Sequence, residues 1–242
     1  EITLTLYVIG RSDENALVLP SGLKAEDFDG MFIAGEMIDD YVHKLSSLKL
    51  PMLLIDFYKL DFDFDCVITD NFFNGYTATN YLIARGHKSI GFLGNPNQTS
   101  SISDRFFGYR KALAKYNLVY EPSWHLVNND PETGIYSLNT ALPDRLPTAY
   151  VCHCDRAAYF LMQRLDMAGI KVPEDISIIS FDNTKLAMNS TPPLTTINID
   201  TKEIARRSYK QLCDRIANPN MQKQKLYIAC DIIERDSVAP PR

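Results

Sequence analysis

Short apolar runs rich in Val, Ile, Leu and Phe recur along the chain, and most are followed by a stretch with helical periodicity. This order is typical of a mainly parallel β-sheet wound with helices, whose strands are buried on both faces. We therefore predict an α/β fold. The predicted strands are Thr3–Ile9, Gly30–Ala34, Met52–Asp56, Cys66–Thr69, Ser89–Gly94, Trp124–Val127, Ala149–Cys152, Ile176–Phe181 and Leu226–Ile233.

Four segments repeat apolar residues at the spacing of one helix face. The first ends at Gly86 and the third at Gly169, and glycine is favoured just past the end of a helix. The second begins at Asp104, a residue type suited to an N-cap. The predicted helices are Asn74–Arg85, Asp104–Tyr116, Asp155–Ala168 and Lys202–Ile216.

The opening of the chain departs from this pattern. Residues 11–27 are too broken by Pro and Gly to form the long first helix of a doubly wound domain, so we expect the first strand-helix unit to be missing. The chain opens on Glu1 and alternating Thr and Leu rather than on a basic and then apolar leader, so no export signal is predicted. Without a repeat or a Ser/Gly-rich linker, the rest reads as one continuous unit, unless the chain crosses more than once between two lobes.

Composition narrows the class of protein. Of the 242 residues, 45% are hydrophobic and 23% charged, which is typical of a globular domain with a sizeable core. The longest mainly apolar runs, such as Pro51–Ile55 and Ile176–Phe181, are far shorter than the roughly 20 residues that span a bilayer. We therefore predict no membrane partner.

The cysteines and the net charge indicate in which compartment the protein works and which partners it could bind. The five cysteines form an odd set without a disulfide framework, which favours a reducing cytoplasm. The net charge is -5, with a pI near 5.4, the opposite of a surface that neutralises nucleic-acid phosphates. If the protein acts on DNA, another module must make the contact.

Seven segments lie in an order that matches one known family. They are FDGMFIAG (Phe28–Gly35), LPMLLID (Leu50–Asp56), the block from Val67 to Gly94, DRFFGYRKAL (Asp104–Leu113), VPEDISIISFDN (Val172–Asn183), PPLTTI (Pro192–Ile197) and IIERDSV (Ile232–Val238). In this order and spacing, the chain resembles the effector-binding domain of the LacI/GalR family of bacterial transcription regulators over nearly its whole length.

The resemblance implies a two-lobed periplasmic-binding-protein-like fold. Each lobe is expected to hold a mainly parallel sheet flanked by helices, and three crossovers are expected near Asn95–Gln98, Asn198 and Met221–Lys225. The implied N-lobe comprises residues 1–96 and 198–222, and the implied C-lobe comprises residues 97–197 and 223–242.

The resemblance also implies a function. The chain would be the ligand-sensing and dimerisation core of a cytoplasmic repressor that binds a small polar effector, by family habit a sugar, between its lobes. Lobe closure would then be coupled to operator binding as an allosteric free energy of about 1–3 kcal/mol. The family's helix-turn-helix, which reads operator DNA as a homodimer, is absent from these residues.

The sequence disfavours two other classes of protein. An exported solute-binding protein of a sugar transporter would share the two-lobed shape, but the cysteines, the lack of a leader and the PPLTTI and IIERDSV segments argue against it. An enzyme is disfavoured because there is no Gly-rich phosphate loop, nucleophile elbow or zinc spacing. We predict no catalysis and no cofactor.

Arg105 and Asp182 are the foremost candidate ligand-binding residues. Arg105 follows a Ser/Thr-rich loop, where its planar guanidinium could hold two hydroxyls or a carboxylate, and the matching family arginine contacts the effector. The alternative is a solvated surface arginine. Asp182 follows a buried strand, and ligands of α/β sheets gather at the carboxyl ends of strands. Its alternative is to cap the following turn.

Asp155 and Cys154 follow the next predicted strand. Asp155 could bind the ligand or act as the N-cap of its helix. Cys154 stands where the family often has Asn or Gly, and a thiol is a poor hydrogen-bond partner, so His153 could replace that contact. The tight Cys152-His153-Cys154 run lacks a second cluster at ligand spacing, and we predict no metal site.

Four further residues complete the predicted site. Asp70 and Ser101 match family pocket positions, but both could instead satisfy local backbone in turns. Phe57 could stack on a sugar ring or simply pack in the core. Asn129, after the strand near residue 126, is a candidate from the C-lobe.

Overall fold

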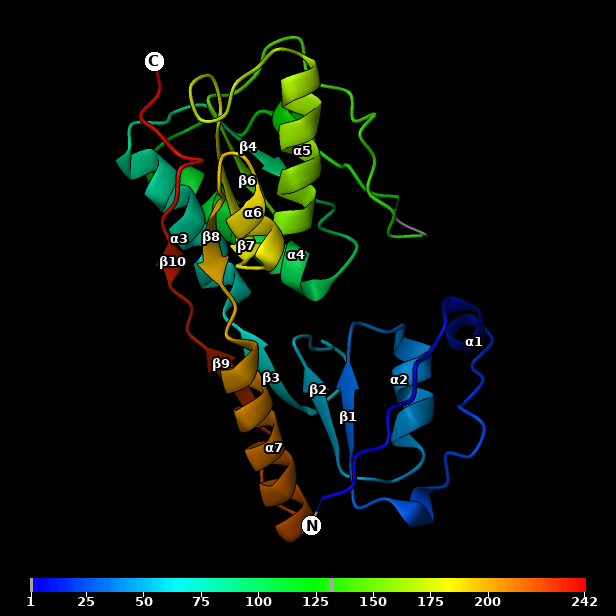
Figure 1. The fold of residues 1–242 in the computed structure, drawn as a ribbon. Helices are drawn as coiled ribbons and strands as arrows, with labels where there is room; N and C mark the ends of the chain where they lie inside the picture. Colours follow the sequence, from blue (N-terminus) through cyan, green and yellow to red (C-terminus); the bar gives the residue numbers. More distant parts are fainter. Residues whose placement is uncertain (1, 131–132) are drawn as a thin grey trace. The chain divides into compact units, whose positions relative to one another are not determined.

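The computed structural model describes residues 2–130 and 133–242. Its contacts divide the chain into two compact units, which Figure 1 shows as ribbons. Unit 1 comprises Glu1–Ile68 and Thr201–Tyr227, and unit 2 comprises Thr69–Asp200 and Ile228–Arg242. The chain therefore passes from one unit to the other three times.

Unit 1 is built on a four-stranded sheet in the order β1-β2-β3-β9. The strands are β1 (Met31–Ala34), β2 (Met52–Ile55), β3 (Asp65–Thr69) and β9 (Lys225–Ile228), and β1, β2 and β3 run parallel. Helix α2 (Asp39–Ser46) buries Tyr41, Val42 and Leu45 against one face. Helix α7 (Thr201–Ala217) packs near β2. Two short helices, α1 (Arg11–Asn15) and η1 (Ala25–Asp27), precede β1.

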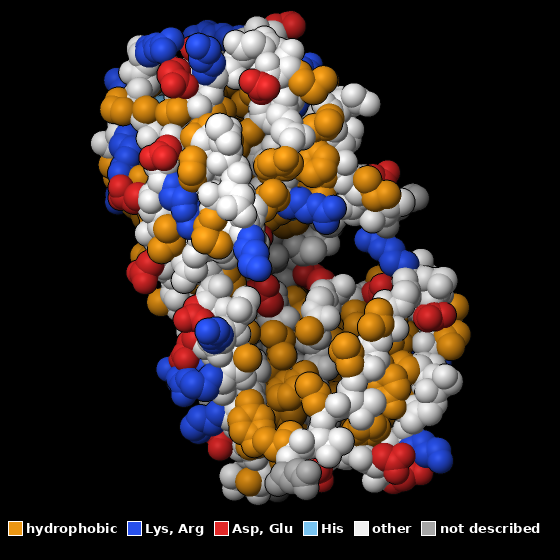
Figure 2. Space-filling view, viewed as in Figure 1, with side chains coloured by type: hydrophobic (Ala, Val, Ile, Leu, Met, Phe, Trp, Pro, Cys, Tyr) orange, Lys and Arg blue, Asp and Glu red, His pale blue; other side chains and the backbone are white. Residues whose placement is uncertain are grey.

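Among the described residues, some apolar side chains on and beside this sheet are not fully buried. Leu53 and Val67 are fully buried, whereas Phe32 on β1 and Ile216 on α7 are partly exposed. Figure 2 shows hydrophobic side chains gathered on the face of unit 1 beside α7.

Unit 2 contains a six-stranded sheet in the order β10-β8-β7-β6-β4-β5. All neighbours are parallel except β10, which is antiparallel to β8. The strands are β4 (Ile90–Leu93), β5 (His125–Leu126), β6 (Ala149–Cys152), β7 (Ser177–Asp182), β8 (Thr195–Asn198) and β10 (Ile232–Ile233). The helices are α3 (Asn71–Ala84), α4 (Ser100–Lys115), η2 (Pro122–Trp124), α5 (Asp155–Met167) and α6 (Lys185–Asn189).

The central strands of unit 2 are buried on both faces because helices cover both. One core contains α3 and α4 together with the strand residues Phe92, Val151 and Ile179. The residues that precede Val151 and Ile179, which are Tyr150 and Ile178, lie in a second core with α5. This alternation is the two-sided burial that the continuous apolar runs predict.

Two glycines bring α3 and α4 into close contact. A Cβ added to Gly75 would lie 2.1 Å from the carbonyl oxygen of Arg105, and one added to Gly108 would lie 2.0 Å from that of Phe72. Only glycine fits such an approach, which fixes the position of Arg105 relative to α3.

The α/β fold class is confirmed, but several details differ from prediction. Thr3–Ile9 forms no strand, and its alternating apolar residues Leu4, Leu6 and Val8 are exposed. The strand β8 was missed, and the region predicted as Leu226–Ile233 forms the two strands β9 and β10. Helix α4 begins at Ser100 with Thr99 as its N-cap, four residues earlier than Asp104.

The contacts divide the chain at other positions than the implied lobes. Residues 69–96 and 198–200 belong to unit 2, and residues 223–227 belong to unit 1. The physical reason for the first difference is that α3 packs on α4 and β4 pairs with β5 and β6, so this segment makes its contacts in unit 2.

Candidate functional site

A row of polar side chains follows the carboxyl ends of four neighbouring strands in unit 2. Asp182 ends β7, His153 and Cys154 follow β6, Gln98 lies in the loop after β4, and Asn129 follows β5. Because these strands are parallel neighbours, their carboxyl ends lie at the same edge of the sheet, where α/β proteins bind ligands. We call this set the polar row.

Arg105 reaches the polar row from the second turn of α4. Its Nε donates to Asn71 Oδ1 at 2.8 Å, and its Nη1 donates to the His153 carbonyl at 2.5 Å. Nη1 also lies 3.7 Å from Asp182 Oδ1, and the guanidinium lies 4.5 Å from the Phe181 ring centroid. Arg105 is only 5% exposed, so it is not the solvated surface arginine of the alternative interpretation.

Asp182 adopts an unusual backbone conformation. Its φ is +108°, and that of the following Asn183 is +55°, a region that non-glycine residues rarely occupy. Such strain persists where the surrounding structure enforces it, often at binding sites. The carboxylate remains partly exposed beside Arg105. The N-cap of α6 is Thr184, not Asp182.

Tyr136 joins the row next to His153 and Cys154. Its hydroxyl lies 3.2 Å from Cys154 Sγ and 3.5 Å from His153 Nε2, and its ring stacks on His153 with centroids 6.1 Å apart. Burial, together with the charge of Arg105, lowers the pKa of His153 to about 3. Burial raises the pKa of the Cys154 thiol to about 11 and also raises the pKa of Tyr136. All three side chains are therefore uncharged near neutral pH.

Two asparagines after β5 carry unpartnered acceptors. Asn129 Nδ2 donates to Gln98 Oε1 at 2.8 Å, and Asn128 Nδ2 donates to the Ala157 carbonyl at 2.9 Å. Within residues 2–130 and 133–242, neither Oδ1 atom has a hydrogen-bond partner, although both are buried. A buried acceptor without a partner costs about 1–3 kcal/mol, so each is a candidate to receive a ligand donor.

Comparison with known proteins identifies the family. Residues 79–238 match the periplasmic binding protein-like domain. The chain belongs to that family. It is 31% identical over 217 residues to the HTH-type transcriptional repressor PurR of Vibrio campbellii, and 35% identical over 208 residues to PurR of Shigella sonnei. These alignments cover 87% and 84% of this chain but 64% and 59% of the relatives, so the chain spans about three fifths of their length.

Solved structures support the same assignment of fold. The transcription regulator CcpA of Lactococcus lactis matches with a TM-score of 0.78 at 21% identity, covering 94% of this chain and 83% of that one. A LacI-family regulator from Enterococcus faecium with bound ribose matches with a TM-score of 0.73 at 26% identity, covering 90% and 82%. A CelR–cellobiose complex matches with a TM-score of 0.75 at 22% identity, covering 86% and 65%. The chain thus corresponds to the effector-binding region of LacI/GalR-type regulators, as the sequence predicts.

Within this periplasmic binding protein-like domain, Asp155 has a structural role that the sequence did not reveal. It is fully buried and accepts hydrogen bonds from the hydroxyls of Ser180, Thr184 and Thr196 and from the Thr184 amide, at 2.6–2.9 Å. It therefore ties β6 to β7 and β8. The N-cap of α5 is Cys154, whose Sγ accepts from the Ala157 amide at 3.4 Å, so the capping alternative for Asp155 is wrong.

The remaining predicted residues have local roles in the described structure. Asp70 is the N-cap of α3 and accepts from the Phe73 amide at 3.0 Å. Ser101 lies in the first turn of α4, with its hydroxyl 3.0 Å from that of Thr99. Phe57 is buried in the core of unit 1, as its packing alternative expects.

Sequence reasoning missed Asn71, Gln98 and Tyr136 as members of the site. Asn71 directly follows Asp70 and Gln98 directly precedes the α4 N-cap, so proximity to predicted residues could have suggested both. Tyr136 lies outside every predicted strand and helix, and no local pattern predicts where its ring goes.

No metal centre or membrane span emerges from the part of the chain that the structure describes. Among these residues, no three His, Cys, Asp or Glu side chains are grouped to hold a metal ion. Cys152 is buried within β6, pointing into the core with Ala158 and Leu161. None of the described helices combines the length and apolarity needed to cross a bilayer.

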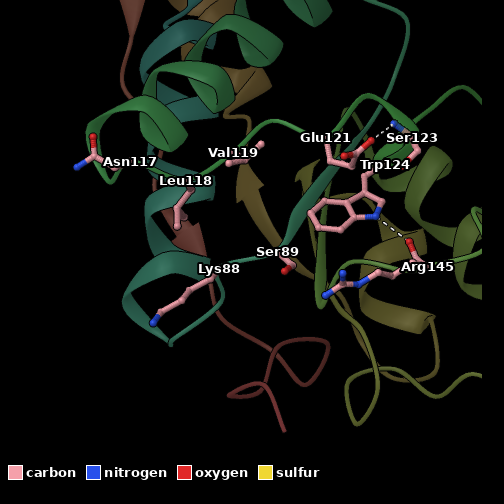
Figure 3. Close-up of a pocket in the computed structure, with 9 residues that line it drawn as sticks. All are labelled: Lys88, Ser89, Asn117, Leu118, Val119, Glu121, Ser123, Trp124 and Arg145. Carbon is pink, nitrogen blue, oxygen red and sulfur yellow. Dashed lines mark hydrogen bonds between the residues drawn. The ribbon is translucent and has the colours of Figure 1, made fainter.

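A hollow of about 550 Å³ lies at the opposite edge of the unit 2 sheet (Figure 3). Its lining includes Lys88 and Ser89, which precede β4, Trp124, which precedes β5, and Arg145, which lies ahead of β6. Trp124 Nε1 donates to the Arg145 carbonyl at 2.7 Å. Lys88 and Arg145 are exposed, and the hollow contains no buried charged group comparable to Arg105. The polar row is therefore the stronger candidate site.

Proposed function

We propose that this chain is the effector sensor of a LacI/GalR-type transcriptional repressor and that its polar row contacts a small polar effector, a sugar or sugar derivative. The observation that carries the proposal is the buried Arg105, held by Asn71 and the His153 carbonyl beside the strained Asp182. A buried guanidinium with donors directed to the ligand-binding edge of an α/β sheet suits hydroxyl or carbonyl oxygens.

The proposed contact residues follow from this geometry. Arg105 and Asp182 supply a donor and an acceptor, and Asn129 and Cys154 lie along the same row. Asp70 and Ser101 flank it at the starts of α3 and α4 and remain proposed contacts of lesser weight. Asp155 would support the row from beneath by holding β6, β7 and β8 together, and binding would involve no catalysis.

Relatives support the regulatory part of the proposal. The two curated relatives described above are named transcriptional repressors, and the titles of two similar structures name bound ribose and a cellobiose complex. Because the chain carries a net charge of -5, operator contacts would come from a helix-turn-helix outside it. We further propose a cytoplasmic homodimer, since paired operator half-sites require two-fold symmetry.

A thermal-shift screen tests the proposed function. The purified chain is heated with sugars, sugar phosphates, nucleobases and amino acids. A ligand that binds only the folded state stabilises it by about 2.7 kcal/mol at a hundredfold excess over its Kd. The proposal predicts that one ligand class raises the midpoint and that Asp182→Asn abolishes the rise. A screen without any rise, or a rise that Asp182→Asn leaves intact, contradicts it.

A further inference from the structure

The hollow at the amino edge of the unit 2 sheet has the size of a small-molecule pocket (Figure 3). Its volume of about 550 Å³ lies within the range of ligand pockets in proteins. Lys88, Ser89, Trp124 and Arg145 all precede strands of the sheet, whereas the polar row follows the strands at their carboxyl ends. A ligand in this hollow would therefore occupy a second site, separate from the polar row.

Trp124 forms an aromatic wall of the hollow, and the fold holds its ring in place. Its Nε1 donates to the Arg145 carbonyl at 2.7 Å, and its amide donates to the Glu121 carbonyl at 3.0 Å. The side chain is only partly buried and lines the hollow. An indole that is already oriented offers a face on which a planar ring can stack, with little ordering cost on binding.

The side chains that line the hollow carry more positive than negative charge. Lys88 and Arg145 are exposed, and among the described residues neither forms an ion pair. Glu121 is ionised near neutral pH, because hydrogen bonds from the Ser123 amide and hydroxyl lower its pKa. Asp144 lines only the neighbouring hollow of about 470 Å³. Two cations therefore face one carboxylate here, in a chain whose net charge is -5.

The backbone that carries Lys88 and Ser89 is anchored. The preceding His87 is buried, with Nδ1 2.9 Å from Thr148 Oγ1 and Nε2 2.9 Å from the Ala239 carbonyl. The Ser89 carbonyl accepts from the Thr148 amide at 2.9 Å. Binding at the hollow therefore needs to order only side chains, which lowers its entropic cost.

We infer that this hollow is a second binding site, for a planar aromatic ligand that carries a phosphate or carboxylate group. The ring stacks on Trp124, and the anionic group pairs with Arg145 and Lys88. Arg145 can hold an oxyanion through two parallel N–H groups, and Lys88 adds a point charge. A neutral aromatic molecule gains only the stacking, and a non-aromatic anion gains only exposed charge contacts, which are weak individually. The inference does not depend on which effector the polar row binds.

The fluorescence of Trp124 tests the inference, because Trp124 is the one tryptophan of the chain. The purified chain is titrated with adenosine 5′-monophosphate and benzoate, with their neutral counterparts adenosine and benzamide, and with inorganic phosphate alone. We expect saturable quenching by at least one aromatic anion and at least about threefold weaker binding of its neutral counterpart, as two exposed charge contacts imply.

The choice between the two aromatic anions identifies whether the site prefers a nucleotide or an aromatic carboxylate. Three results overturn the inference. The first is the lack of saturable quenching by either aromatic anion, and the second is equal binding of an anion and its neutral counterpart. The third is quenching by inorganic phosphate as strong as that by the aromatic anions, because stacking would then contribute nothing.

Charge variants locate the bound ligand. Lys88→Gln and Arg145→Gln each remove one cation from the lining, and each should weaken binding about two- to fivefold. Lys185→Gln is the matched control and should bind as the native chain does, because Lys185 is an exposed lysine on α6, which follows the carboxyl end of β7. Unchanged affinity in both lining variants, or an equal loss in the control, overturns the inference. Quenching that Asp182→Asn abolishes and both lining variants retain would place the ligand at the polar row instead, which also overturns it.

Discussion

Among the described residues, each unit buries an arginine beside an aspartate, and the two pairs differ in their distance and in the exposure of the aspartate. In unit 1, Arg215 lies 2.7 Å from Asp65 and also donates to three backbone carbonyls, while Asp65 accepts further bonds from Gln211 and the Gln224 amide. In unit 2, Arg105 lies 3.7 Å from Asp182 and donates to Asn71 Oδ1 and to the His153 carbonyl.

The difference distinguishes a structural ion pair from the pair in the proposed binding site. Burial by itself raises the pKa of Asp65, but hydrogen bonds from Arg215, Gln224 and Gln211 outweigh it and lower that pKa below its ordinary value. Both carboxylate oxygens of Asp65 already accept hydrogen bonds within the protein. The Arg105 pair lies at the carboxyl edge of a parallel sheet and its Asp182 carboxylate is partly exposed, so a ligand could reach it.

The largest expected effect comes from breaking the saturated pair. Arg215→Met leaves the buried Asp65 carboxylate without its charge partner, and we expect unfolding free energy to fall by about 3–5 kcal/mol in urea denaturation followed by circular dichroism. Arg207→Met on the same helix is the control, because Arg207 is exposed and forms a surface ion pair with Glu203. Its loss should stay below about 1 kcal/mol. Similar losses of unfolding free energy in the two variants would contradict the structural role of the Arg215–Asp65 pair.

The close packing of α3 on α4 comes next. Gly108→Ala forces a Cβ against the Phe72 carbonyl, so we expect a loss of about 1–3 kcal/mol in the same assay. Gly10→Ala is the control, because an added Cβ there meets no atom nearer than 3.7 Å. If Gly108→Ala is as stable as the native chain, the glycine contact does not fix the position of Arg105.

The free energy of unfolding should fall in acid because His153 is neutral in the folded chain. Its folded pKa of about 3 lies below its ordinary value of 6.5, so the unfolded chain binds the extra proton between these pH values. Stability is therefore fully present above pH 6.5 and falls as the pH decreases toward 3, by up to about 1.4 kcal/mol per pH unit. His153→Asn should reduce the loss of unfolding free energy with decreasing pH. His43→Asn, which changes an exposed histidine, should leave that loss unchanged. The check is the unfolding free energy measured between pH 7 and 4.5.

The smallest expected effect concerns the thiol cap of α5. Serine is a preferred N-cap and its hydroxyl is a better acceptor than a thiol, so Cys154→Ser should leave stability unchanged or raise it by about 0.5–1 kcal/mol. Cys213→Ser on α7 is the control, because Cys213 lies within a helix rather than at its start. A marked loss of thermal stability in Cys154→Ser alone would contradict the capping role.

The elements with strong periodicity were predictable from sequence, while pairings between distant residues were not. Continuous apolar runs placed β4, β6 and β7, and one-sided periodicity placed α3 and α5. Thr3–Ile9 has the alternation of a strand, but a strand also needs a partner, and among the described residues it has none. Propensity alone could not reveal that.

The candidate site shows the same limit. The position of Asp182 after an apolar strand predicted its place at the sheet edge. The role of Asp155 depends on hydroxyls from Ser180 and Thr196, which are 25 and 41 residues away, so its local sequence fits a cap or a ligand equally well. Tyr136 and Asn71 enter the site only through the tertiary fold.

The most direct test of the account is a calorimetric titration of the strongest ligand from the screen into the native chain, Arg105→Lys and Arg110→Lys. Lysine keeps the charge but loses the planar array of donors, and Arg110 lies on the same helix but faces the exposed side. The account predicts that Arg105→Lys weakens binding by at least about tenfold, or about 1.4 kcal/mol, and that Arg110→Lys leaves it unchanged. Unchanged affinity in Arg105→Lys would contradict the claim that the polar row of unit 2 binds the effector.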